Sequence, residues 1–144
     1  MGISIVIEAM ISIKPRHVSN IIDGSKLVEL RTKRINMPIG SKLWIYSTLP
    51  VGMIEVSARI QFIETLSPDA IWTKYGRDIC IAEAEFKVYT KGRDVVTAIG
   101  LIDIEELRKK ISLKTLRHYE EGFQPPQFIS KLYPERAIYN AFYG

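Results

Sequence analysis

The sequence has few of the residues from which disulfides and metal sites are built. Only one of its 144 residues is a cysteine, Cys80, so an internal disulfide is excluded. Cys80 has no neighbouring motif and is expected to be a small buried residue. The two histidines, His17 and His118, lie far apart, and no Cys/His cluster has the spacing of zinc ligands. A glycine-rich phosphate loop is also missing. We therefore expect neither a metal site nor a cofactor.

Long apolar runs are missing as well. No apolar stretch reaches the ~18–20 residues that cross a bilayer. The N-terminal segment has no basic residues before its apolar run and reaches Glu8 too early for a signal peptide. With 47% hydrophobic and 25% charged residues, and with no internal repeat, the chain is typical of a single globular domain. We expect a cytoplasmic protein with no membrane partner.

Positive charge is concentrated in one segment, from Lys14 to Arg34. The net charge of this segment is +4, which equals the formal net charge of the whole chain. A local basic excess indicates an anionic partner more specifically than a basic isoelectric point does, although a solvated basic face is the alternative. The segment contains Lys14, Arg16, Lys26, Arg31, Lys33 and Arg34, opposed by Asp23 and Glu29.

Within this segment, residues 24–31 have the pattern Gly-x-Lys-x-x-Glu-x-Arg. In a regular strand the side chains of Glu29 and Arg31 share one face, whereas Lys26 falls on the other. Lys26 therefore joins them only if the strand begins irregularly near Gly24, which a glycine allows. Alternatively, Glu29 and Arg31 form only a surface ion pair, which contributes about 0–1 kcal/mol.

The hydrophobic pattern predicts an α+β fold. We expect strands at 3–13, 26–33, 42–47, 53–63 and 94–103, and residues 104–111 fit either a strand or a helix. We expect helices from Pro15 to Gly24, from Ser112 to Tyr119 and at about 134–143, with a two-part helical insertion at about 67–92 that includes a helix from Pro68 to Gly76. The short connection between strands 42–47 and 53–63 favours an antiparallel hairpin. The whole pattern favours a mostly antiparallel barrel of five to six strands, closed or partly closed, with short peripheral helices.

The motif at 24–31 resembles the signature of the ASCH domain, a small β-barrel related to the PUA domains that bind RNA. The similarity extends over about residues 11–132, and includes Ser12-Ile13-Lys14-Pro15 and Ile45 to Pro50. It implies a PUA-like barrel with a cleft between the first helix and the motif strand, in which RNA or a nucleotide-like ligand binds. Longer relatives that carry a helix-turn-helix module are described as predicted transcriptional regulators, whereas this chain resembles the ASCH unit alone.

The resemblance assigns roles to individual residues. Lys26 would meet a phosphate or a base carbonyl, Glu29 would accept from a base amino group, and Arg31 would pair with phosphate or with Glu29. Further contacts are expected from Lys14, Arg16, Tyr46 and Ser47. Tyr46 either stacks on a base or fills the core, and Ser47 either donates to a ligand or caps a turn, whereas Trp44 is favoured as a core residue.

Two enzymatic readings stay open, although the residues favour binding. Some small ASCH-like proteins are amidohydrolases that act on N4-acetylcytidine, with a motif lysine, a threonine and a distant glutamate. Here Lys26 is kept, Glu29 stands in the threonine's place, and the distant glutamate is unassigned between Glu83 and Glu85. A carboxylate does not replace a hydroxyl in acyl chemistry, so Lys26 and Glu29 are catalytic candidates only if the protein is a hydrolase. A ribonuclease is the other alternative.

The C-terminal helix carries aromatic residues that need a surface to cover them. Tyr139, Phe142 and Tyr143 either pack on the barrel or form a contact between two copies of the chain, in which case the protein would be a homodimer.

Overall fold

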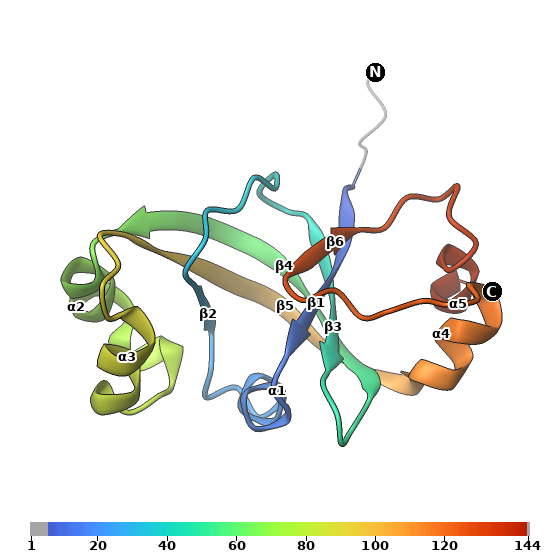
Figure 1. Ribbon diagram of the computed structural model, residues 1–144, viewed down its shortest axis with the longest axis horizontal. Helices are drawn as coiled ribbons and strands as arrows, with labels where there is room; N and C mark the ends of the chain where they lie inside the picture. The colour runs from blue at the N-terminus through green and yellow to red at the C-terminus, as the bar shows by residue number, and fades with distance from the viewer. Residues whose placement is uncertain (1–5, 144) are drawn as a thin grey trace.

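One curled six-stranded sheet organises the molecule (Figure 1), and the computed structural model describes residues 6–143. The order across the sheet is β2-β5-β4-β3-β1-β6. Four of the five neighbouring pairs are antiparallel, and β1 and β3 are parallel. The predicted α+β, PUA-like, mostly antiparallel fold is therefore confirmed, as a partly closed barrel. The strands are β1 (Glu8–Ile13), β2 (Val28–Arg31), β3 (Lys42–Ser47), β4 (Met53–Leu66), β5 (Val96–Ser112) and β6 (Ile129–Lys131).

Five short helices surround the sheet. In Figure 1, α2 and α3 lie at one end of the molecule, α4 and α5 lie at the opposite end, and α1 lies between them. None of the described helices is long and apolar enough to cross a membrane. The helices are α1 (Pro15–Ile22), α2 (Pro68–Ile79), α3 (Glu83–Thr90), α4 (Leu113–Tyr119) and α5 (Tyr139–Tyr143).

The two faces of the curled sheet are buried against different helices. On one side, Val18 and Ile21 of α1 pack on apolar residues of β1, β3, β4 and β5. On the other side, Leu116 of α4 packs in a second cluster with Trp44 and Tyr46. Side chains of α2 and α3 form a third cluster with β2 and the start of β5. This arrangement leaves the first turn of α1 and the end of β1 beside the motif strand.

Residues 104–111, which fitted either a strand or a helix, are strand and continue β5 to Ser112. Several predicted boundaries were wrong. Helix α2 does not stop at Gly76 but runs to Ile79, because the left-handed residue that ends it is Cys80 (φ 60°). Cys80 is consequently half-buried rather than fully buried. The motif strand is shorter than expected and begins at Val28, and residues 3–5 of the first predicted strand lie outside the described residues.

The C-terminal helix is also shorter than predicted, since α5 begins at Tyr139 rather than near residue 134. Its aromatic residues pack on the barrel, with ring centroids of Phe142 and Trp44 4.9 Å apart. The Glu8 carboxylate at the start of β1 accepts hydrogen bonds from Trp44 Nε1 at 3.0 Å and from the Tyr139 and Tyr143 hydroxyls. These contacts fasten the tail to β1 and β3 and cover Trp44, which is only 6% exposed.

Candidate nucleic-acid binding site

Lys26 reaches the motif cluster because the chain before β2 is irregular. Gly24 ends the first helix with φ +88°, and the backbone N–H of Lys26 donates to Asn20 O instead of joining the sheet. The side chain is 2% exposed, and Nζ donates to Ile79 O at 2.8 Å, at the end of α2. The irregular backbone thereby turns the lysine side chain to the same side as Glu29, which is the condition stated from the sequence for the three side chains to meet.

Glu29 lies between two cations. Its Oε1 is 3.4 Å from Lys26 Nζ, and its Oε2 accepts from Arg31 Nη2 at 2.7 Å and from Arg31 Nε at 3.0 Å. Arg31 Nη2 also donates to Ser12 O of β1 at 2.6 Å. The three side chains therefore form one cluster, which carries a net positive charge and links β2 to β1 across the open side of the sheet.

This cluster lines a large pocket of about 830 Å³. Its walls come from the ends of β1 and β3, from α1, α3 and α4, and from the loop of residues 124–127. Lys14 and Arg16 line the pocket from α1 and the residue before it. Arg16 is held by Glu85 of α3 through two hydrogen bonds of 2.8 Å, so the basic rim is partly neutralised.

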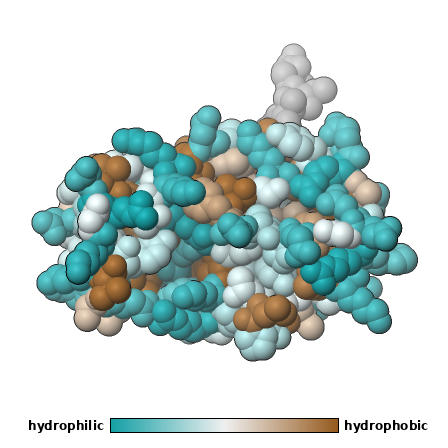
Figure 2. Space-filling model, viewed as in Figure 1, coloured by the Kyte–Doolittle hydropathy of each residue, from teal (hydrophilic) through white to brown (hydrophobic). Residues whose placement is uncertain are grey.

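The rim of the pocket carries apolar groups beside the charged ones. Leu49 in the β3–β4 hairpin is 72% exposed and Val88 on α3 is 77% exposed, and both line the pocket. Figure 2 shows a largely hydrophilic face with separate apolar patches over this hairpin and over α3. Apolar groups beside a few polar ones are typical of the lining of small-molecule sites.

Polar atoms without partners are buried around the pocket. Among residues 6–143, four buried side-chain polar atoms have no hydrogen-bond partner: Ser12 Oγ, His17 Nδ1, Tyr46 OH and Ser47 Oγ. Ser12, His17 and Tyr46 all belong to the pocket wall. An unpaired buried polar group costs about 1–3 kcal/mol, so three of them on residues that line one pocket make that wall a candidate place for a polar ligand.

Burial also shifts the protonation of these groups. It lowers the pKa of His17 below its ordinary value of 6.5, and the neighbouring Lys26 charge lowers that pKa further. Burial raises the pKa of the Tyr46 hydroxyl above 10.0, although the charge of Arg117 acts in the opposite direction. At neutral pH the imidazole is therefore uncharged and the phenol keeps its proton.

The remaining sequence candidates have different locations. Ser47 is fully buried next to Tyr46 but does not line the pocket. Glu85 lines it, whereas Glu83 lies in a separate hollow. The described residues contain no group of three or more His, Cys, Asp or Glu side chains placed to hold a metal ion.

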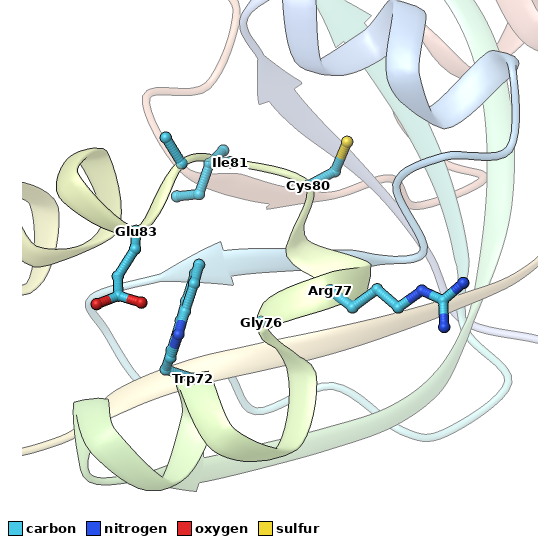
Figure 3. Close-up of a pocket in the computed structure, with 7 residues that line it drawn as sticks. Trp72, Gly76, Arg77, Cys80, Ile81 and Glu83 are labelled. Carbon is cyan, nitrogen blue, oxygen red and sulfur yellow. The ribbon is translucent and has the colours of Figure 1, made fainter.

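The separate hollow, of about 490 Å³, lies between α2 and α3 (Figure 3). Trp72 and Glu83 stand on one side of it, and Arg77 extends away from both. It contains none of the motif residues, so we assign the site to the larger pocket.

Sequence reasoning missed several residues of the pocket. His17 was considered only as a metal ligand, and Tyr89 of α3, Arg117 of α4 and Gln124 were not considered at all. Pro125 and Pro126, which also line the pocket, were the one available signal, because prolines mark a loop and loops often carry binding residues.

The curled sheet and the charged pocket at its open side define a PUA-like domain. The chain belongs to the ASCH family: residues 9–130 match the family model described as a domain of unknown function (DUF365). A protein of Zymomonas mobilis named ASCH domain-containing ribonuclease is 34% identical over 129 residues, which are 89% of this chain and 86% of that protein.

Solved structures agree with this assignment. The crystal structure of ASCH from Zymomonas mobilis is 31% identical, with a TM-score of 0.86 over 94% of this chain and 93% of that one. Human THYN1, solved in complex with 5-methylcytosine-containing DNA, is 11% identical, with a TM-score of 0.58 over 95% of this chain and 96% of that one. At that identity the likeness to THYN1 concerns the fold alone.

Proposed function

We propose that the protein binds RNA, with one nucleotide held in the pocket between β1 and β2. One observation carries the proposal: Ser12, His17 and Tyr46, each with a buried polar atom that has no partner, line the same pocket as the Lys26–Glu29–Arg31 cluster. The polar groups would pair with a base or ribose, and the cations would meet a phosphate. The 34% identity to a protein named a ribonuclease supports RNA as the ligand.

Binding is tested with a labelled single-stranded RNA of about eight nucleotides, a length within the ~4–16 nucleotides that single-strand-binding folds cover. Lys26→Met keeps most of the buried stem and removes the charge, so it should weaken binding several-fold. Lys74→Met, on exposed α2, is the matched control and should leave the affinity unchanged. Affinity should fall with salt, with a slope of about 0.7 per neutralised phosphate. An affinity indifferent to salt would contradict the proposal and favour a small uncharged ligand.

RNA cleavage is the second candidate, and the name of the Zymomonas mobilis relative favours it. In this reaction the 2′-hydroxyl loses its proton and its oxygen bonds to phosphorus. The bond from phosphorus to the 5′-oxygen breaks, and that oxygen takes up a proton. His17, uncharged at neutral pH, is the candidate base, and Tyr46, which keeps its proton, is the candidate acid. Lys26 and Arg31 would stabilise the charge that develops on the phosphate oxygens.

Cleavage is tested by following RNA beside a 2′-O-methyl strand of the same sequence. The RNA should be cut to products with a 2′,3′-cyclic phosphate, and the 2′-O-methyl strand should stay intact because it lacks the nucleophile. His17→Ala should reduce the rate about 10²-fold or more if the imidazole is the base. Equal cutting of both strands would exclude this chemistry. Incubation with N4-acetylcytidine tests the amidohydrolase alternative, and release of cytidine would favour it.

A further inference from the structure

A second basic segment, outside the motif, follows the bulged end of β5 into α4. Between the cross-strand pairs Val56–Glu106 and Ile54–Ile111, residues 107–110 of β5 lie opposite the single residue Glu55 of β4. This irregular bulge carries the run Arg108-Lys109-Lys110. Bulges of this kind redirect side chains and are frequent beside functional sites.

Ion pairs hold the bulge at Lys110, whereas the two cations before it, Arg108 and Lys109, are exposed. Lys110 Nζ lies 3.2 Å from Glu55 Oε2 and 3.3 Å from Glu106 Oε2. Arg108 and Lys109 are exposed, and neither has an ion-pair partner within residues 6–143.

Helix α4 connects this bulge to the pocket. Leu113 and Arg117 are one turn apart on α4 and both line the pocket. Lys114 is exposed, precedes Arg117 by three residues and therefore lies beside it on the helix surface. Lys109 is four residues before Leu113, so their Cα atoms are at most about 14 Å apart.

Some of the acidic residues around this segment are paired, whereas Glu105 and Glu121 are exposed and have no ion-pair partner within residues 6–143. Glu106 is neutralised by Lys110, and Glu120, just after α4, is 3.0 Å from Arg136. Exposed cations thus continue outward from the pocket wall at Arg117 to Lys114 and the bulge. A series of exposed cations beside a pocket suits the backbone of a strand, because phosphates recur at every nucleotide.

We propose that residues 108–117 form a phosphate-binding track, so that the ligand is an oligonucleotide strand and not a free nucleotide. The inference rests on the proposed RNA binding and adds the class of ligand to it. The nucleotide in the pocket is one residue of a longer strand, whose neighbouring phosphates contact Lys114, Lys109 and Arg108. A mononucleotide fills the pocket but leaves the track empty.

The test compares two uncleavable probes, a 2′-O-methyl oligouridylate of about eight nucleotides and 2′-O-methyluridine monophosphate. The double variant Lys109→Gln/Lys114→Gln removes two track charges and no pocket residue. It should keep the affinity for the monophosphate and lower the salt slope for the oligomer by about 1.4. When the salt is raised from about 50 to about 200 mM, the affinity for the oligomer should therefore fall about sevenfold further in the wild type than in the variant.

The control is Lys74→Gln/Lys131→Gln, which removes the same charge from α2 and β6 and should keep the wild-type slope. Equal loss in both double variants would overturn the track, because net charge alone would then explain the effect. Unchanged oligomer binding by the track variant would overturn it too, as would an equal loss for both probes. If the wild type binds neither probe, the proposed function itself fails, and the track fails with it.

Discussion

Replacing Glu29 with glutamine tests whether its carboxylate holds the cluster together. The ion pairs at 2.7 and 3.4 Å are each worth on the order of 5 kcal/mol of attraction at an effective dielectric constant of ~20, and desolvation offsets most of it. Removing one partner of a buried pair costs about 3–5 kcal/mol. Lys26 keeps Ile79 O at 2.8 Å, and Arg31 keeps Ser12 O. We therefore expect a loss near the lower end, about 3 kcal/mol, which lowers Tm by roughly 6–12 °C.

Thermal and urea unfolding followed by circular dichroism measure this loss. Lys26→Met alone should cost less than Glu29→Gln, because Arg31 continues to neutralise Glu29. The double variant should recover part of the loss of Glu29→Gln, since it no longer buries an unpaired lysine charge. A Glu29→Gln protein as stable as the wild type would refute the reasoning. Strict additivity of the two single changes would refute it as well.

Three further outcomes follow from the structure. The folded pKa of His17 lies below its unfolded value of 6.5, so the free energy of unfolding should fall as the pH drops below about 6.5. In urea titrations at several pH values, His17→Gln should reduce that fall, and an unchanged pH dependence would argue against a buried, neutral His17. Tyr46→Phe should leave stability unchanged or raise it by up to about 1 kcal/mol while weakening RNA binding, since it deletes a hydroxyl with no partner; a clear loss of Tm would contradict this. Gly100→Ala should destabilise by about 1–3 kcal/mol in the same unfolding assay, because its Cβ would overlap the Phe62 ring that covers the glycine; wild-type stability would show that the ring moves aside freely.

The motif cluster was predictable because its logic is local. The pattern at 24–31 placed Glu29 and Arg31 on one face, and the glycine allowed Lys26 to turn toward them. Both inferences needed only residues that are neighbours in the sequence. The contact of Lys26 with Ile79 O was not predictable, because it depends on where α2 ends. That helix passes Gly76, the expected stop, and ends at Cys80.

The polar wall of the pocket could not be found from the sequence, because it depends on a long-range strand pairing. Strands β1 and β3 are parallel, and their register places Ser12 opposite Tyr46. The two residues are far apart in the chain, and neither strand shows in its own pattern which neighbour it will have. The antiparallel hairpin of β3 and β4 could be predicted from the sequence, because the short connection between the strands leaves few other ways to pair them.

The motif cluster also has a structural task that a binding role alone does not explain. Strand β2 is the first strand of the sheet and β1 the fifth, so no ladder joins them directly. The bond from Arg31 Nη2 to Ser12 O joins these two strands across the open side of the barrel, and the same opening forms the pocket. The cluster therefore bridges the opening beside the pocket as well as contributing charge to it. Arginine suits this position because its planar fork can bond Glu29 and the β1 backbone at once, whereas the single ammonium of lysine is less well placed to do both. The geometry of the opening is therefore a reason for an arginine at position 31 that is separate from any contact of Arg31 with a phosphate.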